Sequence, residues 1–215
     1  MTSERAAREA LVETMREMGA SGLNRGTSGN VSLRFGSAML VSPSAVPPEE
    51  LTPDLVAKME LDDETGAWTG PRPPSTEWRF HRDILRARGD VSAVVHTHSP
   101  YVTVLAILRR EIPAVHYMIA GFGGSTIRCS DYATFGTEAL SRAALTALEG
   151  RNGCLLANHG SITVAPTPAR ALWLAVELEM LAFQYHQALL VGEPVILSDE
   201  AIAETAAKFA DYGRR

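Results

Sequence analysis

Two periodicities of apolar residues follow one another along the chain, and each predicts a different kind of element. Apolar side chains recur every three or four residues over 3–18, which is typical of an amphipathic helix that buries one face. Similar spacing predicts helices at 77–88, 101–109, 138–148 and 168–190, and a last helix after Ser198. Short apolar runs predict strands at 31–35, 38–41, 91–95, 154–157 and 162–164. Because helices and strands interleave, we expect a single α/β domain over residues 1–215.

Proline-rich segments separate these elements at two places. Residues 43–53 contain four prolines and residues 71–74 contain three, so both segments are predicted to be irregular. Ser75-Thr76 is then predicted as the N-cap of the helix over 77–88, with Glu77 in its first turn. Neither segment is long enough to be a flexible linker, which supports the expectation of one domain.

The composition is that of an ordinary globular protein, with 46% hydrophobic and 21% charged residues, and it excludes collagen-like and disordered chains. The net charge of −5 argues against a nucleic-acid partner. No apolar run approaches the roughly 18 residues of a membrane span, and the N-terminus lacks a signal-type apolar segment. Cys129 and Cys154 are too few for a disulfide framework, which indicates a reducing compartment. We therefore expect a cytoplasmic protein with no membrane partner.

Histidines at the ends of two buried strands are the most specific chemical feature. His96 and His98 are two positions apart, so on a strand both imidazoles point to the same side. This spacing suits a metal ion, and it suits two hydrogen-bonded histidines equally well. His159 also follows a buried strand, and a sheet could bring it beside the pair. Three imidazoles would leave a coordination position open, as a catalytic zinc site requires.

Other polar residues have common structural explanations. His81 and His186 lie on predicted helices, where a surface or packing role is the better interpretation, and the pattern does not place His116. A glutamate at a helix start, such as Glu77, is favoured by the helix dipole and is usually just solvated. The pattern alone therefore assigns no chemistry to these residues.

A glycine-rich turn precedes the first predicted strand. Residues 26–30, Gly-Thr-Ser-Gly-Asn, offer backbone N–H groups, two hydroxyls and an amide that suit a phosphate group, although most such loops are only turns. The segment is not a Walker loop, because no Gly-Lys-Ser/Thr follows. Ser42-Pro43-Ser44 and Ser75-Thr76 supply further hydroxyls.

Six motifs, in order along nearly the whole chain, resemble the class II aldolase/adducin family. They lie at residues 22–32, 74–81, 94–98, 112–120, 132–137 and 158–160. Within the family, they are most similar to the L-fuculose-1-phosphate aldolases. The resemblance implies a three-layer α/β fold: a single domain with a central, mainly antiparallel sheet flanked by helices.

The resemblance also implies a reaction and its metal. The reaction is the zinc-dependent, reversible cleavage of a ketose 1-phosphate into dihydroxyacetone phosphate and a small aldehyde. The substrate would be L-fuculose 1-phosphate or a related deoxyketose or pentulose 1-phosphate. One Zn²⁺ per subunit, or another divalent metal, would be held by His96, His98 and His159. Glu77 would be a metal ligand at rest that substrate displaces, and then the base at the carbon next to the carbonyl.

The remaining site residues carry over by the same resemblance. Those that fall on phosphate-binding positions are Thr27, Asn30, Ser44, Ala45, Ser75 and Thr76. Ala45 stands where family members usually have glycine, so phosphate contact through its backbone is in question. Tyr117 matches a tyrosine that acts as proton donor in a neighbouring subunit's site. Tyr212 matches a tyrosine that helps to close the aldehyde pocket, and Phe135 is a candidate for lining that pocket. The implied assembly is a homotetramer with active sites at subunit interfaces.

Several functions within the family remain open at this point. Pentulose-phosphate 4-epimerases, methylthioribulose-phosphate dehydratases and oxo-tetronate-phosphate decarboxylases share the family, although Tyr117 and the segment 132–137 fit an aldolase better. A non-catalytic, adducin-head-like interaction domain is the alternative from another class, and it predicts a broken metal group. The sequence does not choose the aldehyde.

Overall fold

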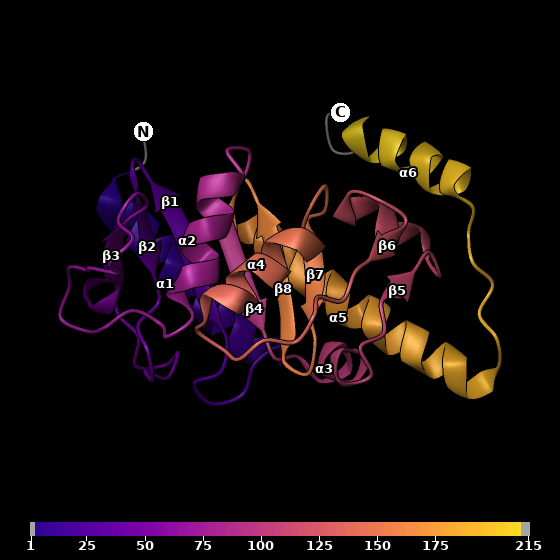
Figure 1. The fold of residues 1–215 in the computed structure, drawn as a ribbon, viewed down its shortest axis with the longest axis horizontal. Coiled ribbons are helices and arrows are strands. Elements are labelled where there is room, and N and C mark those ends of the chain that lie inside the picture. Colours follow the sequence, from indigo (N-terminus) through magenta and orange to yellow (C-terminus); the bar gives the residue numbers. More distant parts are fainter. Residues whose placement is uncertain (1–2, 212–215) are drawn as a thin grey trace.

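A six-stranded antiparallel sheet forms the centre of the computed structural model, which describes residues 3–211. The strand order is β3–β2–β1–β4–β8–β7, and all neighbouring strands pair antiparallel (Figure 1). The strands are β1 (Asn30–Phe35), β2 (Ala38–Val41), β3 (Ala57–Glu60), β4 (Ala93–Thr97), β7 (Gly153–Leu156) and β8 (Gly160–Ala165). The expected antiparallel α/β class is therefore confirmed.

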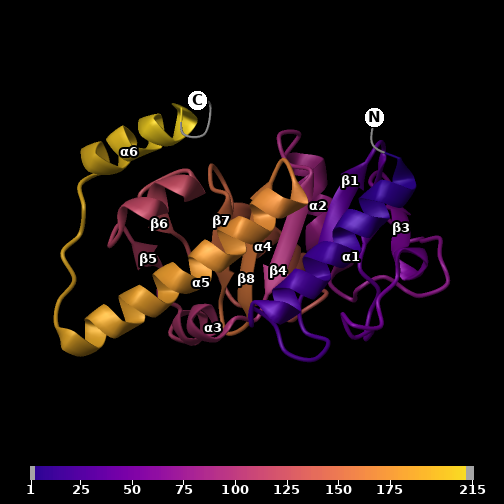
Figure 2. The ribbon, with the colours of Figure 1, turned by 180° about the vertical axis from the view of Figure 1, so that it is seen from behind.

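Helices cover both faces of this sheet, which gives three layers. α1 (Glu4–Ala20) and α5 (Pro168–Val191) lie across one face, with α3 (Pro100–Ile107) beside α5 (Figure 2). α2 (Trp78–Ala87) and α4 (Glu138–Ala147) cover the other face. α1, α2 and α4 each bury one apolar face, as the spacing of apolar residues predicts.

The central strand β4 shows how the two faces divide the core. Ala93 and Val95 contact the α1 and α5 side, whereas Val94 faces α2 and α4. His96 follows Val94 by two positions and shares its face, because side chains alternate along a strand. Its ring meets Phe80 of α2 edge to face, with 5.4 Å between the centroids. His96 is thus a titratable residue at the end of a row of β4 side chains that is otherwise apolar.

Smaller elements lie beyond the β7 edge. The short strands β5 (Ile112–Pro113) and β6 (Thr126–Ile127) pair with each other, and the 3₁₀ helix η2 (Tyr117–Phe122) lies between them in sequence. The last helix, α6 (Asp199–Asp211), follows an extended segment and packs on η2 (Figure 1). A second 3₁₀ helix, η1 (Pro53–Leu55), precedes β3. None of the described helices is long and apolar enough to cross a membrane.

The structure differs from the expected elements at several places. β3 was not expected. β4 begins at Ala93 rather than at residue 91, and it includes His96. α2 begins at Trp78, so Glu77 is its N-cap residue instead of lying in the first turn, and Ser75-Thr76 is not the cap. The reason is a local turn, in which the Trp78 N–H donates to the Ser75 carbonyl at 3.0 Å.

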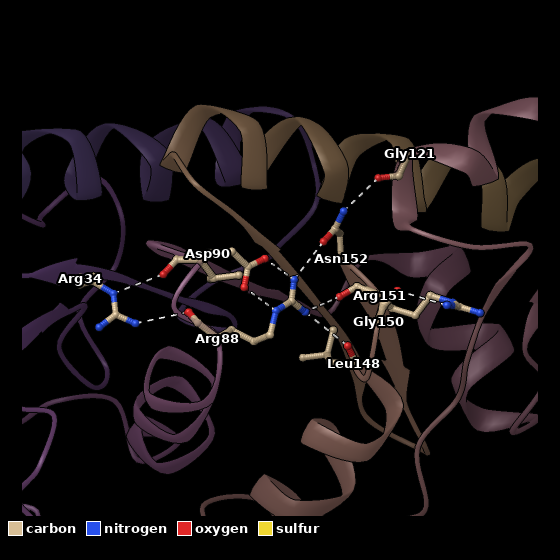
Figure 3. Close-up of polar contacts among 9 residues, drawn as sticks. Arg34, Arg88, Asp90, Gly121, Leu148, Gly150, Arg151 and Asn152 are labelled. Atoms are coloured by element: carbon tan, nitrogen blue, oxygen red, sulfur yellow. Dashed lines mark hydrogen bonds and ion pairs between the residues drawn. The ribbon is translucent and has the colours of Figure 1, made fainter. Parts of the chain in front are cut away.

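A group that we call the arginine cluster closes the end of the sheet where β4 begins (Figure 3). Arg88 donates to both carboxylate oxygens of Asp90, at 2.8 and 2.7 Å, and to the Arg151 carbonyl at 2.9 Å. Arg34 donates to the Val91 carbonyl at 3.3 Å and to the Leu85 carbonyl. These bonds tie β1, α2 and the segment after α4 together.

Candidate metal centre

Four side chains converge at the other end of β4. The ligand atoms of Glu77, His96, His98 and His159 all lie within 4.8 Å of one another. Glu77 comes from the start of α2, His96 and His98 from the end of β4, and His159 from the turn between β7 and β8. The predicted convergence of the three histidines is therefore what the structure shows, and the glutamate joins them.

The sheet register and two unusual backbone positions create this convergence. His96 pairs with Asn30 of β1 on one side and with Ile162 of β8 on the other. Asn158 turns the chain with φ of 56°, a left-handed conformation that asparagine tolerates. At Gly160, a Cβ would lie 2.2 Å from the Thr97 carbonyl oxygen, so only glycine allows β8 to start beside the end of β4.

Hydrogen bonds fix how the imidazoles face the centre. His96 Nδ1 lies 2.8 Å from the Ser161 carbonyl oxygen, which can only accept, so Nδ1 carries the proton. The lone pair of His96 Nε2 therefore points into the centre. His98 Nε2 lies 2.9 Å from this atom. The His98 backbone N–H donates to Asn24 Oδ1 at 2.9 Å, which fixes the chain just beyond β4.

The donor set fits a divalent metal. A tetrahedral zinc with bonds of about 2.0–2.1 Å places its ligand atoms about 3.3 Å apart. His96 Nε2 lies 3.3 Å from Glu77 Oε2, and His159 Nε2 lies 3.3 Å from Glu77 Oε1. Glu77 Oε1 is buried and has no hydrogen-bond partner among the described residues. A cation at the centre would satisfy this oxygen together with the imidazole lone pairs.

The protonation states also suit a cation. Burial first, and neighbouring His96 second, lower the pKa of His98 and of His159 to about 4 each. Burial raises the pKa of Glu77, but His96, His159 and the Asn30 amide outweigh this and hold it below its usual range. At neutral pH, His98 and His159 are neutral and Glu77 is ionised, which is the state that metal ligands require.

A cavity of about 300 Å³ opens beside the centre. Its lining residues are Thr76, Glu77, His98, Tyr132, Ala133, Phe135, Asn158 and His159. Phe135, predicted at the aldehyde pocket, thus lies in the same cavity as the metal-ligand group. One wall is polar and holds the ligands, and the facing segment 132–135 supplies two aromatic rings and a methyl group.

The residues predicted to bind phosphate come together only in part. The loop at 42–45 pairs with the loop at 73–75, because the Ser75 N–H donates to the Ser42 carbonyl at 2.9 Å and the Ser44 N–H donates to the Pro73 carbonyl at 3.1 Å. The Asn30 side chain is buried and donates from Nδ2 to Glu77 Oε2 at 2.9 Å. Thr27 is exposed in the turn before β1. Ala45 adopts φ of 56°, a left-handed conformation that favours glycine.

Tyr117 does not join the centre of its own chain. Tyr117 is half exposed on η2 and lines a different cavity, of about 640 Å³, together with Arg170, Trp173 and Phe209. Tyr212 lies outside the described residues. The roles of both tyrosines stay predictions.

Some residues that shape the centre were not found from the sequence. His81 is fully buried and hydrogen-bonded to Ser32 and Asn30, rather than being an ordinary packing residue of its helix. Asn24 positions the His98 backbone, and its amide fills the space over Gly29, where a Cβ would lie 2.1 Å from Asn24 Nδ2. Gly29 in the 26–30 turn was a sign of close packing in the sequence, but the sequence did not identify Asn24 as the residue that packs against it.

Comparisons with known proteins place this chain in a family. The family model of the class II aldolase and adducin N-terminal domain matches residues 9–186. The chain is 50% identical to the 5-methylthioribulose-1-phosphate/5-deoxyribulose-1-phosphate aldolase of Rhodospirillum rubrum, covering 97% of this chain and 93% of that protein. It is 44% identical to the L-fuculose phosphate aldolase of Escherichia coli strain K12, covering 100% of this chain and 99% of that protein.

Solved structures lead to the same family. An L-fuculose 1-phosphate aldolase matches with a TM-score of 0.92 at 36% identity, covering 98% of both chains. The metal-ligand group of one glutamate and three histidines is complete here, whereas the adducin-head-like alternative predicts a broken one. The chain therefore belongs to the class II aldolase and adducin family, as a metal-dependent lyase of the aldolase type.

Proposed function

We propose that this protein is a zinc-dependent aldolase that reversibly cleaves a ketose 1-phosphate into dihydroxyacetone phosphate and a small aldehyde. The observation that carries the proposal is the state of Glu77. Its carboxylate is buried and ionised, one oxygen is held by Asn30, and Oε1 is unpaired among the described residues. An oxygen in this state can serve a metal ion or take up a proton at the edge of the cavity.

The chemistry follows from the direction in which electrons move. When bound, the metal supplies Lewis acidity that stabilises negative charge on substrate oxygen atoms. Cleavage breaks the bond between C3 and C4 of the ketose, the C4 hydroxyl gives up its proton to solvent, and the aldehyde leaves. The electron pair stays with the three-carbon phosphate fragment. Glu77, once it has taken up a proton from solvent, would deliver that proton to the carbon of this fragment, and it would remove the same proton in the direction of synthesis.

The cavity supports a substrate with an apolar end. Beyond the metal-ligand group, the walls are formed by Tyr132, Ala133 and Phe135, which offer apolar contact to a methyl or methylthio group. One relative is named for 5-methylthioribulose 1-phosphate and 5-deoxyribulose 1-phosphate, and another for L-fuculose phosphate. We place 5-methylthio- and 5-deoxyribulose 1-phosphate first, because their aldehyde fragments carry no further hydroxyl to bury against these rings.

The phosphate, the assembly and the location complete the proposal. The paired loops at 42–45 and 73–76, with the 26–30 turn, would receive the phosphate through hydroxyl and backbone N–H groups. Tyr117 is half exposed and does not line the cavity beside its own chain's centre, which supports a homotetramer in which it serves a neighbouring subunit. Cys154 is buried, with a pKa raised to about 12, so it stays an unreactive thiol, as suits the cytoplasm.

The experiment that tests this proposal uses zinc-loaded protein and three substrates. Release of dihydroxyacetone phosphate is followed with a coupled reductase for 5-methylthioribulose, 5-deoxyribulose and L-fuculose 1-phosphates. We expect equal amounts of dihydroxyacetone phosphate and aldehyde, with the highest kcat/KM for the first two compounds. Phe135→Ala should lower kcat/KM for the methylthio substrate by about 10-fold or more, an effect expected from lost apolar contact. Epimerised ketose without net release would instead indicate an epimerase.

A further inference from the structure

A row of buried polar side chains runs behind the metal centre, away from the cavity. It begins at Ser32 of β1, passes through His81 of α2 and Asn30 of β1, and ends at Glu77. Ser32 Oγ lies 2.8 Å from His81 Nδ1, His81 Nε2 lies 2.5 Å from Asn30 Oδ1, and Asn30 Nδ2 lies 2.9 Å from Glu77 Oε2. Ser32 and His81 are fully buried, and the other two side chains are nearly so.

The chemistry of each group fixes the direction of every bond in this row. The Asn30 Nδ2–H donates to Glu77 Oε2, a carboxylate oxygen that accepts this bond. The Asn30 carbonyl oxygen then faces His81, and because this oxygen can only accept, His81 must donate from Nε2. Burial lowers the pKa of His81 to about 3, so the ring is neutral and carries one proton. His81 Nδ1 is then an acceptor, and the Ser32 hydroxyl must donate to it.

We propose that His81, held in its Nε2–H tautomer by Ser32, is a positioning residue that sets the orientation of the Asn30 amide and thereby fixes Oε2 of Glu77. A reversed Asn30 amide would place its oxygen against the carboxylate and its NH₂ against the His81 Nε2–H. Both contacts would be repulsive, so the row has one low-energy arrangement. With Oε2 fixed, Oε1 is the oxygen left for the metal ion or for the proton. The proposal rests on the proposed role of Glu77 as proton acceptor.

The tautomer can be measured without any catalysis. In the metal-free protein labelled with ¹⁵N-histidine, we expect the two His81 nitrogens to give the signals of a neutral ring protonated at Nε2 at pH 7. Ser32→Ala removes one oxygen and leaves Nδ1 without its donor, so a fraction of the Nδ1–H form should appear. A wild-type His81 that carries its proton on Nδ1, or on both nitrogens, would overturn the proposal. This result is independent of whether Glu77 acts as the base.

Variants of His81 separate positioning from packing. His81→Gln keeps an N–H donor for Asn30 and an acceptor for Ser32, whereas His81→Phe fills the space without either. We expect His81→Phe to slow exchange of the dihydroxyacetone phosphate C–H proton by about 10–100-fold with zinc content retained, and His81→Gln to restore most of the rate. His186→Gln, on the half-buried face of α5, should change nothing.

Two outcomes of this series count against the proposal. His81→Phe with a normal exchange rate would show that Asn30 needs no guidance. Equal losses in the Phe and Gln variants would show that only the ring's shape matters. If His81→Phe does not fold, Ser32→Ala decides, since it should lower the exchange rate several-fold in proportion to its Nδ1–H fraction. A normal exchange rate in Glu77→Gln would refute the proposed function and leave the tautomer result standing.

Discussion

The two ends of strand β4 use charged side chains in opposite ways. At its start, Arg88 is surrounded by acceptors, and its guanidinium bonds to Asp90, to Asn152 and to two backbone carbonyls (Figure 3). At its end, Glu77 has a buried oxygen with no partner among the described residues. His98 and His159 stand beside it as neutral rings. The guanidinium of Arg88, at the start of β4, is thus fully hydrogen-bonded, whereas the carboxylate and imidazoles at the end of β4 keep lone pairs that a cation could use.

This difference separates stability from chemistry. A buried acceptor without a partner costs about 1–3 kcal/mol, and folded proteins keep such groups where they have a use. The arginine cluster stabilises the fold and needs no ligand. The metal centre is electrostatically incomplete, and a cation completes it. Changes at the first end should therefore alter unfolding free energy, and changes at the second should alter metal binding and rate.

The largest effect is expected for Glu77→Gln. The amide keeps the shape of the side chain and can still accept a hydrogen bond, but it cannot take up a proton. Zinc should remain bound by three imidazoles, while solvent exchange of the dihydroxyacetone phosphate C–H proton should fall by roughly 10²–10⁴-fold. Proton NMR in D₂O measures this rate. A normal rate would make another group the base, with Tyr117 the next candidate, and loss of zinc would make Glu77 chiefly a ligand.

His98→Ala should act mainly on metal affinity. Structural zinc sites with four ligands bind with about 10–16 kcal/mol, so one ligand contributes about 3–4 kcal/mol, or 10²–10³-fold in Kd. The zinc-dependent rise in Tm should shrink accordingly, while the metal-free Tm should change little, because His98 is partly exposed. Elemental analysis with calorimetry tests both, with His186→Ala as the control. Stoichiometric zinc with undiminished turnover would refute the ligand assignment.

Arg88→Met should lower the stability of the fold and leave metal affinity unchanged. It leaves the Arg151 and Leu148 carbonyls without their donor, so the free energy of unfolding should fall by about 1–3 kcal/mol. The matched control is Arg86→Met, which breaks only an exposed ion pair with Glu64 and should cost about 0–1 kcal/mol. Urea unfolding gives both values. A change in zinc affinity in Arg88→Met would mean that the two ends are coupled.

The pH dependence of stability should come from the metal end. The folded-state pKa values of His81, His98 and His159 lie at about 3, 4 and 4, below the unfolded value of about 6.5. Below pH 6.5 the unfolded chain binds more protons, so the metal-free protein should lose stability as the pH falls toward 4. The slope is up to about 1.4 kcal/mol per pH unit for buried His81, and less for the other two.

The arginine cluster should respond in a different pH range. Hydrogen bonds from Arg88 lower the pKa of Asp90 to about 2, from an ordinary 3.8. The contribution of Asp90 is therefore complete above pH 3.8 and is lost only as the pH falls from there to about 2. Urea midpoints measured between pH 7 and 4.5 isolate the histidine contribution. A flat profile over that range would contradict the neutral, buried histidines.

The smallest effect is expected at Ala45. Its φ of 56° is unfavourable for any residue with a Cβ by about 1–2 kcal/mol, and glycine relieves this strain at a cost of about 0.4–1 kcal/mol in unfolded-chain entropy. Ala45→Gly should thus stabilise the protein by up to about 1 kcal/mol. Asn158→Gly, at the same φ, should gain less, because asparagine tolerates this conformation. A loss of stability in Ala45→Gly would show that its methyl group packs usefully.

Much of the fold follows from local patterns. The helix expected over 168–190 is α5, Pro168–Val191, because a long apolar period and a proline at the first position agree. β3 escaped prediction because Ala-Lys-Met-Glu is short and lies at the sheet edge, where burial is incomplete. The start of α2 was misplaced because the side chain of Glu77 faces the centre and caps no N–H.

Only those residues of the metal centre that lie at recognisable strand ends could be predicted from the apolar pattern. His96, His98 and His159 lie at the ends of buried runs, and they meet because β8, which begins directly after His159, pairs with β4. His81 could not be identified in this way, because it lies on helix α2 and its partners Ser32 and Asn30 lie on strand β1. Which polar side chains meet depends on the register of the strands, and the pattern of apolar residues does not determine that register.

The register of β4 against β1 and β8 has a consequence for the order of folding events. The donor atoms come from three separate parts of the chain and meet only when Asn30 faces His96 and Ile162 faces it from the other side. A slip by one residue would turn His96 to the α1 and α5 face, into the mainly apolar core on that side. Tight metal binding is thus a late event in refolding, because it requires β1, β4 and β8 to be paired already in their native register.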